Sequence, residues 1–309
     1  MNKYKLSLHP FLIALPLALP FSAMADAYLS ATTGSGPNGY RSTELRGNAD
    51  LFETPLSVNA MTFKSDTSAS DSISQSAVGL NWKISELATL GVMHNTQDNS
   101  LVDITGNAIS LAFELDTLWQ GTLQTRLDLK RSPSAYHFNN LPKKAAQYET
   151  INQTGSSVGL TQGITDWLSV NAGRDQYSYD NDPYELATFL MRRAPRKFKN
   201  TSSNLLSMPE ATNYFGLTWR PTEALTVDLS SSKTRTQLDQ DLKTNLLGID
   251  YQVTGHLNIY AAVSKVTSTA VVTKKTILPN LPLISIPAGT TVAPATEDTY
   301  SEFSLGWTF

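Results

Sequence analysis

Cysteine is absent from this 309-residue sequence, and histidine occurs only four times. Without thiols the chain can form neither disulfides nor cysteine-based metal sites. After residue 25 there is no run of about 18 apolar residues, so we expect no transmembrane helix. Glycine-rich phosphate loops, metal-ligand clusters and carboxylate groupings of the acid-protease kind are also missing. We therefore expect no metal and no cofactor.

Excess charge of one sign is missing too. The formal net charge is -3, and residues of both signs are spread along the chain. A nucleic-acid binder would gather lysines and arginines into a basic patch or stripe. No such pattern dominates this sequence, so we expect no nucleic-acid partner.

The N-terminus predicts a secretory signal peptide at residues 1–25. Two lysines precede a short apolar stretch, and Ala23 and Ala25 form the A-x-A pattern of a cleavage site. We therefore expect a single mature domain at 26–309. An N-terminal membrane anchor is the alternative, but the apolar stretch is short for a membrane span.

The rest of the chain consists of segments in which apolar and polar residues alternate, which is typical of half-buried strands. Fourteen such segments are predicted. Their ranges are 26–35, 43–52, 55–65, 74–84, 87–96, 105–116, 119–131, 152–163, 166–177, 208–219, 224–236, 242–253, 256–269 and 297–309.

The predicted connections alternate strictly between short and long. Tight turns follow every second segment, and the longest intervening connections are 132–151, 178–207 and 270–296. Outer-membrane barrels have short periplasmic turns, long extracellular loops and an even number of strands. The prediction is an all-β fold: a transmembrane, antiparallel, up-and-down β-barrel of about 14 strands. A soluble, secreted all-β domain is the alternative.

The two faces of each segment differ as a membrane barrel requires. In segment 119–131, Leu127 and Leu129 share one side, and Arg126 and Lys130 share the other. A charge on the lipid face near the midplane costs about 2–4 kcal/mol, so the charged side is predicted to face the lumen. Parity assigns twelve inward charges: Glu44, Arg46, Asp50, Lys83, Glu114, Arg126, Asp128, Lys130, Asp175, Asp228, Asp250 and Glu302.

Aromatic residues are predicted to form a girdle at the periplasmic end. They lie on apolar faces near a short turn or near the C-terminus, where a barrel meets the membrane interface. The predicted members are Trp82, Trp119, Trp219, Tyr251 and Trp307.

The last segment, "SEFSLGWTF", places Phe303, Leu305, Trp307 and Phe309 on one side. In this alternation and its terminal aromatic, the sequence resembles the bacterial outer-membrane β-barrel class, which includes the porins. Trp307 stands where that class more often has tyrosine. The resemblance implies location in the outer membrane of a Gram-negative bacterium, contact with lipid and lipopolysaccharide, and recognition of the last strand by the barrel-assembly machinery.

A fourteen-stranded barrel is too wide to be filled by small side chains, so we expect a water-filled lumen. The alternative is that the inward charges pair and plug it. The 178–207 connection carries a basic cluster that is a candidate constriction. It could fold into the lumen, bind lipopolysaccharide phosphates at the rim, or be an ordinary solvated loop. Its members are Arg192, Arg193, Arg196, Lys197 and Lys199.

One enzymatic alternative involves the outward face. Parity places His94 near Thr96, Ser76 and Asn107, which resembles a Ser-His-Asn hydrolase acting on outer-leaflet lipids. Serine, threonine and asparagine are abundant throughout the chain, so such proximity arises easily by chance. The prediction is therefore a non-enzymatic, monomeric, porin-like channel for small hydrophilic solutes. A structural or export barrel serving a partner is the other alternative.

Overall fold

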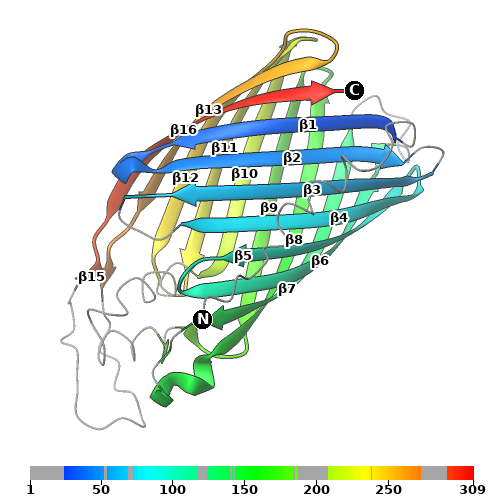
Figure 1. Ribbon diagram of the computed structural model, residues 1–309. Coiled ribbons are helices and arrows are strands. Elements are labelled where there is room, and N and C mark those ends of the chain that lie inside the picture. The colour runs from blue at the N-terminus through cyan, green and yellow to red at the C-terminus, as the bar shows by residue number, and fades with distance from the viewer. Residues whose placement is uncertain are drawn as a thin grey trace, which may run out of the picture.

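The structure is a computed structural model in which the described residues are 24–51, 54–68, 72–116, 124–139, 141, 143–183, 185–186, 208–237, 239–272 and 291–309. Within these ranges the chain forms one closed barrel of fourteen antiparallel strands and a separate two-stranded pair. Figure 1 shows the strands running side by side around the barrel. The predicted fold class is confirmed.

The barrel strands follow the predicted segments closely, mostly to within a few residues. They are β1 (Met24–Ser35), β2 (Arg41–Leu51), β3 (Leu56–Asp66), β4 (Ile73–Ser85), β5 (Ala88–Asp98), β6 (Val102–Glu114), β7 (Thr125–Phe138), β8 (Thr150–Thr165), β9 (Leu168–Tyr179), β10 (Pro209–Thr222), β11 (Leu225–Thr236), β12 (Asp241–Gln252), β13 (Leu257–Ser268) and β16 (Thr296–Thr308). The smaller elements are the 3-10 helices η2 (Pro37–Gly39) and η4 (Lys143–Tyr148), and the strand pair β14 (Val271–Val272) with β15 (Thr291–Ala293).

The barrel closes between its first and last strands. β1 pairs with β16 along eight residues, from Tyr28 opposite Thr308 to Ser35 opposite Ser301. In Figure 1 the red β16 lies beside the blue β1. The backbone N–H of Phe309 also donates to the carbonyl of Ala27, at 2.8 Å. Closure leaves no free sheet edge, which is a requirement for strands surrounded by hydrocarbon.

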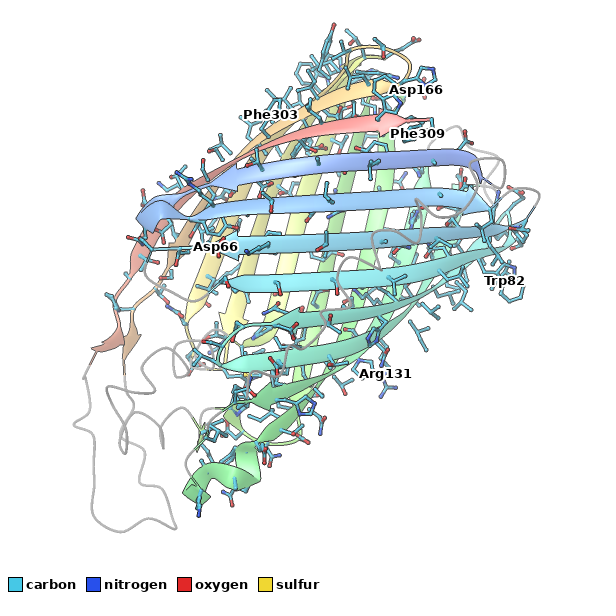
Figure 2. All side chains as sticks on the ribbon, in the orientation of Figure 1. Asp66, Trp82, Arg131, Asp166, Phe303 and Phe309 are labelled. Carbon is cyan, nitrogen blue, oxygen red and sulfur yellow. The ribbon has the colours of Figure 1, made fainter. Side chains whose placement is uncertain are left out.

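Large apolar side chains cover the outside of the barrel. Ile109 is 59% exposed and Phe215 is 54% exposed, although both lie in the middle of paired strands. An apolar band of this kind is the surface that lipid-facing strands present. The band ends in aromatic residues near the short turns, and Figure 2 shows Trp82 projecting from the barrel. The exposed aromatics there are Trp82, Trp167, Trp219, Tyr251 and Trp307. Trp119 lies outside the described residues, and Trp167 was not predicted.

Strict alternation of short and long connections is wrong. The connection 99–101 between β5 and β6 has three residues, although it lies at the end where long loops were expected. At the opposite end, the connection 115–124 between β6 and β7 has ten. The longest connections, 180–208 and 269–295, still share one end of the barrel, and the chain enters β1 and leaves β16 at the other.

The prediction of 119–131 for the seventh strand was also displaced. β7 begins at Thr125, and residues 119–123 of the predicted segment lie outside the described residues. At its other end β7 continues through Pro133 to Phe138. Proline has no N–H to donate, and pairing with β6 is interrupted between Arg131 and Ser134. Pairing with β8 continues past Pro133 and carries the strand onward.

No helix in the described parts of the chain is long and apolar enough to cross a membrane. Residues 1–23 are outside the described ranges, so the signal peptide stays a prediction.

Candidate functional site

One face of the sheet lines cavities inside the barrel. A cavity of about 500 Å³ is bordered by Asp50, Lys83 and Arg126, which come from β2, β4 and β7. A second cavity, of about 550 Å³, is bordered by Arg46 and Lys130. Small and polar side chains such as asparagine, serine and alanine make up most of the remaining lining of both. This wall is therefore polar and does not fill the space that it encloses.

The registers place all twelve of the charges assigned by parity on that same face. One row of directly opposed residues runs from Asp50 through Asn81, Ser110 and Lys130 to Asp175. Because side chains alternate along each strand, every second residue from a member of this row shares its face. The twelve residues are Glu44, Arg46 and Asp50 on β2, Lys83 on β4, Glu114 on β6, Arg126, Asp128 and Lys130 on β7, Asp175 on β9, Asp228 on β11, Asp250 on β12 and Glu302 on β16.

The two halves of the wall differ in charge. All four cations of the set are on β2, β4 and β7, and four of the anions lie in the same half of the barrel, on β2, β6 and β7. Most of these charges pair locally. The Arg126 guanidinium is 2.9 Å from Asp128 and 3.2 Å from Glu114, and Arg46 is 2.9 Å from Glu44. The formal charges of this half of the set therefore cancel.

The other half of the wall carries the remaining four carboxylates of the set and none of its four cations. They are Asp175, Asp228, Asp250 and Glu302, and in the described parts of the chain no ion pair involves them. Two accept hydrogen bonds from neutral groups. The Thr218 hydroxyl donates to Asp228 at 2.6 Å, and the Asn258 amide donates to Asp250 at 3.1 Å. Hydrogen bonds of this kind hold the carboxylates in place without neutralising them.

Three of these carboxylates form a compact group. Asp228 is opposite Gly248, which is opposite Ala262, which is opposite Glu302. Asp250 lies two residues from Gly248 on the same strand and the same face. The group creates an anionic strip on the β11–β16 wall. Because the charges of the β2–β7 half cancel, an electric field crosses the lumen towards this strip.

Inward tyrosines are the lumen residues that the list of charges missed. Tyr260 is directly opposite Asp250, and Tyr214 is directly opposite Gly173. The ring of Tyr260 also covers Gly248, where an added Cβ would lie 2.6 Å from the phenol oxygen. The parity that turned Asp250 inward also turns Tyr260 inward, so the signal was present in the sequence.

A buried apolar cluster lies at the long-connection end of the lumen. Leu186, from the connection after β9, has no exposed surface and packs on Val102, Phe138 and Ile151. Alternation along β6 and β7 gives Val102 and Phe138 the same inward face as Ser110 and Lys130. The start of this connection therefore packs against the inner wall at the mouth.

A polar contact supports the same packing. The Tyr148 hydroxyl on η4 donates to the Glu185 carboxylate at 2.8 Å. Burial, together with this hydrogen bond, raises the pKa of Tyr148 above its ordinary value. The candidate constriction residues Arg192, Arg193, Arg196, Lys197 and Lys199 lie outside the described residues, so their location stays a prediction.

The outward polar group around His94 does not form a hydrolytic triad in the described structure. His94 Nδ1 and Asn107 Oδ1 are 2.9 Å apart, but the Ser76 hydroxyl bonds to Thr96, also at 2.9 Å. No hydrogen bond joins His94 to Ser76 among the described residues, so the base does not contact the nucleophile. In the same ranges, no group of three or more histidine or carboxylate side chains could hold a metal ion.

Comparisons with known proteins give a fold likeness only. No protein-family model and no curated protein sequence matches the chain. Among solved structures, a KdgM porin is 6% identical, with 91% of this chain and 99% of that chain covered and a TM-score of 0.42. The outer membrane channel DcaP of Acinetobacter baumannii is 8% identical, with 92% and 96% covered and a TM-score of 0.46. OccK3 of Pseudomonas aeruginosa is 9% identical, with 98% and 99% covered and a TM-score of 0.45. At these levels of similarity, function has to be argued from the barrel itself.

Proposed function

We propose that the protein is a porin-like channel for passive diffusion of small hydrophilic solutes through the outer membrane of a Gram-negative bacterium. The observation that carries the proposal is the pairing of an apolar outer surface with a polar, incompletely filled interior. Barrels of about eight strands can be filled by side chains, whereas wider ones leave an aqueous path. A closed barrel with these two surfaces suits a membrane on the outside and water within.

Location and assembly follow from the same surface. One chain closes the barrel with its own strands, so no second copy is needed to cover an edge. The proposed state is therefore a monomer in contact with lipid. The apolar residues of β16 and Phe309 are exposed on the outside, which supports recognition of this strand by the barrel-assembly machinery.

The channel should prefer cations. The β2–β7 half of the charge set cancels, whereas the other half leaves four carboxylates without a cationic partner in the described structure. Low-dielectric walls focus the field of fixed charges into a narrow aqueous path. Hydrophilic cations and neutral solutes should therefore pass more readily than anions of the same size.

Single-channel recording of refolded protein in a planar lipid bilayer tests the proposal. We expect discrete conductance steps and, in a salt gradient, a reversal potential whose sign indicates selectivity for cations over anions. If protein that is shown to be folded gives no conductance at all, the proposed channel function is refuted and a structural or export barrel is favoured. No enzymatic activity is proposed, because the His94 group lacks a base-to-nucleophile contact in the described structure.

A further inference from the structure

Two arginines lie on the outside of the barrel, away from the lumen. Arg131 follows the inward Lys130 on β7, and Arg174 precedes the inward Asp175 on β9, so alternation turns both outward. Both side chains are exposed. Figure 2 shows Arg131 projecting from the barrel surface on the side that carries Trp82.

Both arginines stand at the border of the apolar band. Arg131 is directly opposite Ile109 on β6, and Arg174 is directly opposite Val158 on β8, two of the exposed apolar residues. One outward position further towards the long-connection end, the residue is polar on three of these strands: Asn107 on β6, Ser156 on β8 and Gln176 on β9. On β7 and β10 the corresponding residues are Pro133 and Ala211. The guanidinium groups are therefore at the height where hydrocarbon gives way to headgroups.

Neither arginine makes an ion pair within the described residues. Their outward neighbours explain this. Arg131 is surrounded by Ile109, Ser156, Leu129 and Pro133, none of which is acidic. Arg174 likewise has Val158, Asn213, Ala172 and Gln176 around it.

Three outward cations on the far side of the barrel are different. Lys233 is 2.7 Å from Asp241, Lys265 is 2.7 Å from Glu297, and Arg235 is 2.6 Å from Asp239. The chain therefore neutralises these outward cations but supplies no acid to Arg131 and Arg174. Unpaired charge beside hydrocarbon needs a partner from outside the protein.

We propose that Arg131 and Arg174 bind phosphate groups of lipopolysaccharide in the outer leaflet. A guanidinium presents two parallel N–H donors that match two phosphate oxygens, and charge-assisted bonds of this type are stronger than neutral ones. Asn107, Ser156 and Asn213 add neutral donors on either side of the arginines. The surface thus combines an apolar band for acyl chains with a cationic and polar edge for their headgroups.

The spacing of the arginines favours lipopolysaccharide over a phospholipid. β8 separates the two residues, so they lie two strand spacings, roughly 10 Å, apart across the strands, and Arg174 is displaced by two further residues along β9. Both guanidinium groups can reach one phosphodiester only if the two side chains bend towards each other. A glycolipid with several phosphate groups can engage both at once, and bivalent binding of that kind raises affinity above that of either contact.

The experiment uses full-length, refolded protein in detergent and a titration with fluorescently labelled lipopolysaccharide. The test variant is the double substitution Arg131→Gln with Arg174→Gln. We expect its affinity for lipopolysaccharide to fall at least about tenfold, since two charge-assisted contacts to phosphate are lost. Enzymatically dephosphorylated lipopolysaccharide should bind weakly and equally to both proteins. The substitution Lys265→Gln, which removes a paired outward cation, is the matched control and should bind normally.

Several results would overturn the proposal. Unchanged affinity of the double variant would exclude a role for these arginines. Equal losses with phosphorylated and dephosphorylated glycolipid would exclude phosphate as the ligand. Equal losses with phosphatidylglycerol vesicles and with lipopolysaccharide would refute the choice of glycolipid. Heat-modifiable gel mobility checks folding, and Arg131→Lys with Arg174→Lys should restore part of the affinity. The proposal rests on the outer-membrane location and not on conduction, so the conductance of the double variant should remain that of the wild type.

Discussion

The carboxylate group on the β11–β16 wall should set the ion selectivity of the lumen. The perturbation is the triple substitution Asp228→Asn, Asp250→Asn and Glu302→Gln, which removes three negative charges with almost no change in shape. The three residues lie on one patch of the inner wall around Gly248 and Ala262. Asn258 and Thr218 can still hydrogen-bond to the new amides, so the wall should keep its structure.

The expected magnitude follows from Coulomb's law with screening. A monovalent cation about 8 Å from one carboxylate gains roughly 0.5 kcal/mol in water. At about 0.1 M salt the Debye length of about 10 Å reduces this to roughly 0.2 kcal/mol. Three carboxylates then contribute about 0.7 kcal/mol, which is about a threefold change in cation occupancy. At about 1 M salt the Debye length of about 3 Å should remove nearly all of the effect.

Reversal potentials across a salt gradient in planar bilayers measure this change. At low salt the reversal potential of the wild type should indicate cation selectivity, and that of the triple variant should be closer to zero. A matched control removes three negative charges from the outer face, with Asp66→Asn, Asp98→Asn and Asp103→Asn. Alternation places these residues outward near the long-connection end, so their loss should alter the potential much less.

Two outcomes would refute the reasoning. The first is an unchanged reversal potential at low salt in a triple variant that still conducts, because the three carboxylates would then not face the ion path. The second is an equal shift in the control variant, because surface charge in general would then account for the selectivity.

Three further predictions concern the wall and the mouth. Leu160→Arg places a charge on an outer position that is 47% exposed, and should lower the free energy of unfolding by about 2–4 kcal/mol, measured by urea unfolding in vesicles. The inward Thr161→Arg should change that free energy little and should alter conductance instead. Similar losses from both would contradict the face assignment. Gly248→Val should push the Tyr260 ring into the lumen and lower conductance, and the added change Tyr260→Ala should restore it; no loss in the single variant would contradict the close approach. Leu186→Ala should increase protease cleavage within the 180–208 connection while the barrel stays intact, because a buried leucine is lost from the apolar cluster at the mouth of the lumen. As the control, Leu87→Ala changes an exposed leucine and should leave the cleavage rate unchanged.

Strand number and face came from the sequence because both are local properties. A lipid-facing strand must alternate, and a one-residue slip would turn residues such as Arg126 and Asp128 into hydrocarbon. Leu129, Leu247 and Leu305 accordingly lie on the outside at the positions that parity gave them. The same rule fixed which side of each strand carries charge without any knowledge of its neighbours.

Strand ends depend on partners and were predicted less well. The alternation predicted a seventh strand over 119–131, whereas β7 runs from Thr125 to Phe138, and residues 119–123 lie outside the described residues. The predicted segment ended at residue 131, but pairing with β8 carries the strand through Pro133 to Phe138. A ladder of hydrogen bonds exists only where both strands are present, and one strand's own sequence does not contain that information.

Alternation and composition thus determined the barrel, the approximate positions of its fourteen strands and the side of the wall on which each charge lies. Only closure decided which charges share a half of the lumen. Arg126 pairs with Asp128 and Glu114 on one side of the lumen. Asp228, Asp250 and Glu302 gather on the other side, although Asp228 and Glu302 are 74 residues apart along the chain. Closure likewise brought Leu186 onto Phe138 and left Arg131 and Arg174 without an acidic neighbour. These relations arise from register between strands, and register is fixed by the sum of all the pairings around the barrel and not by any single segment.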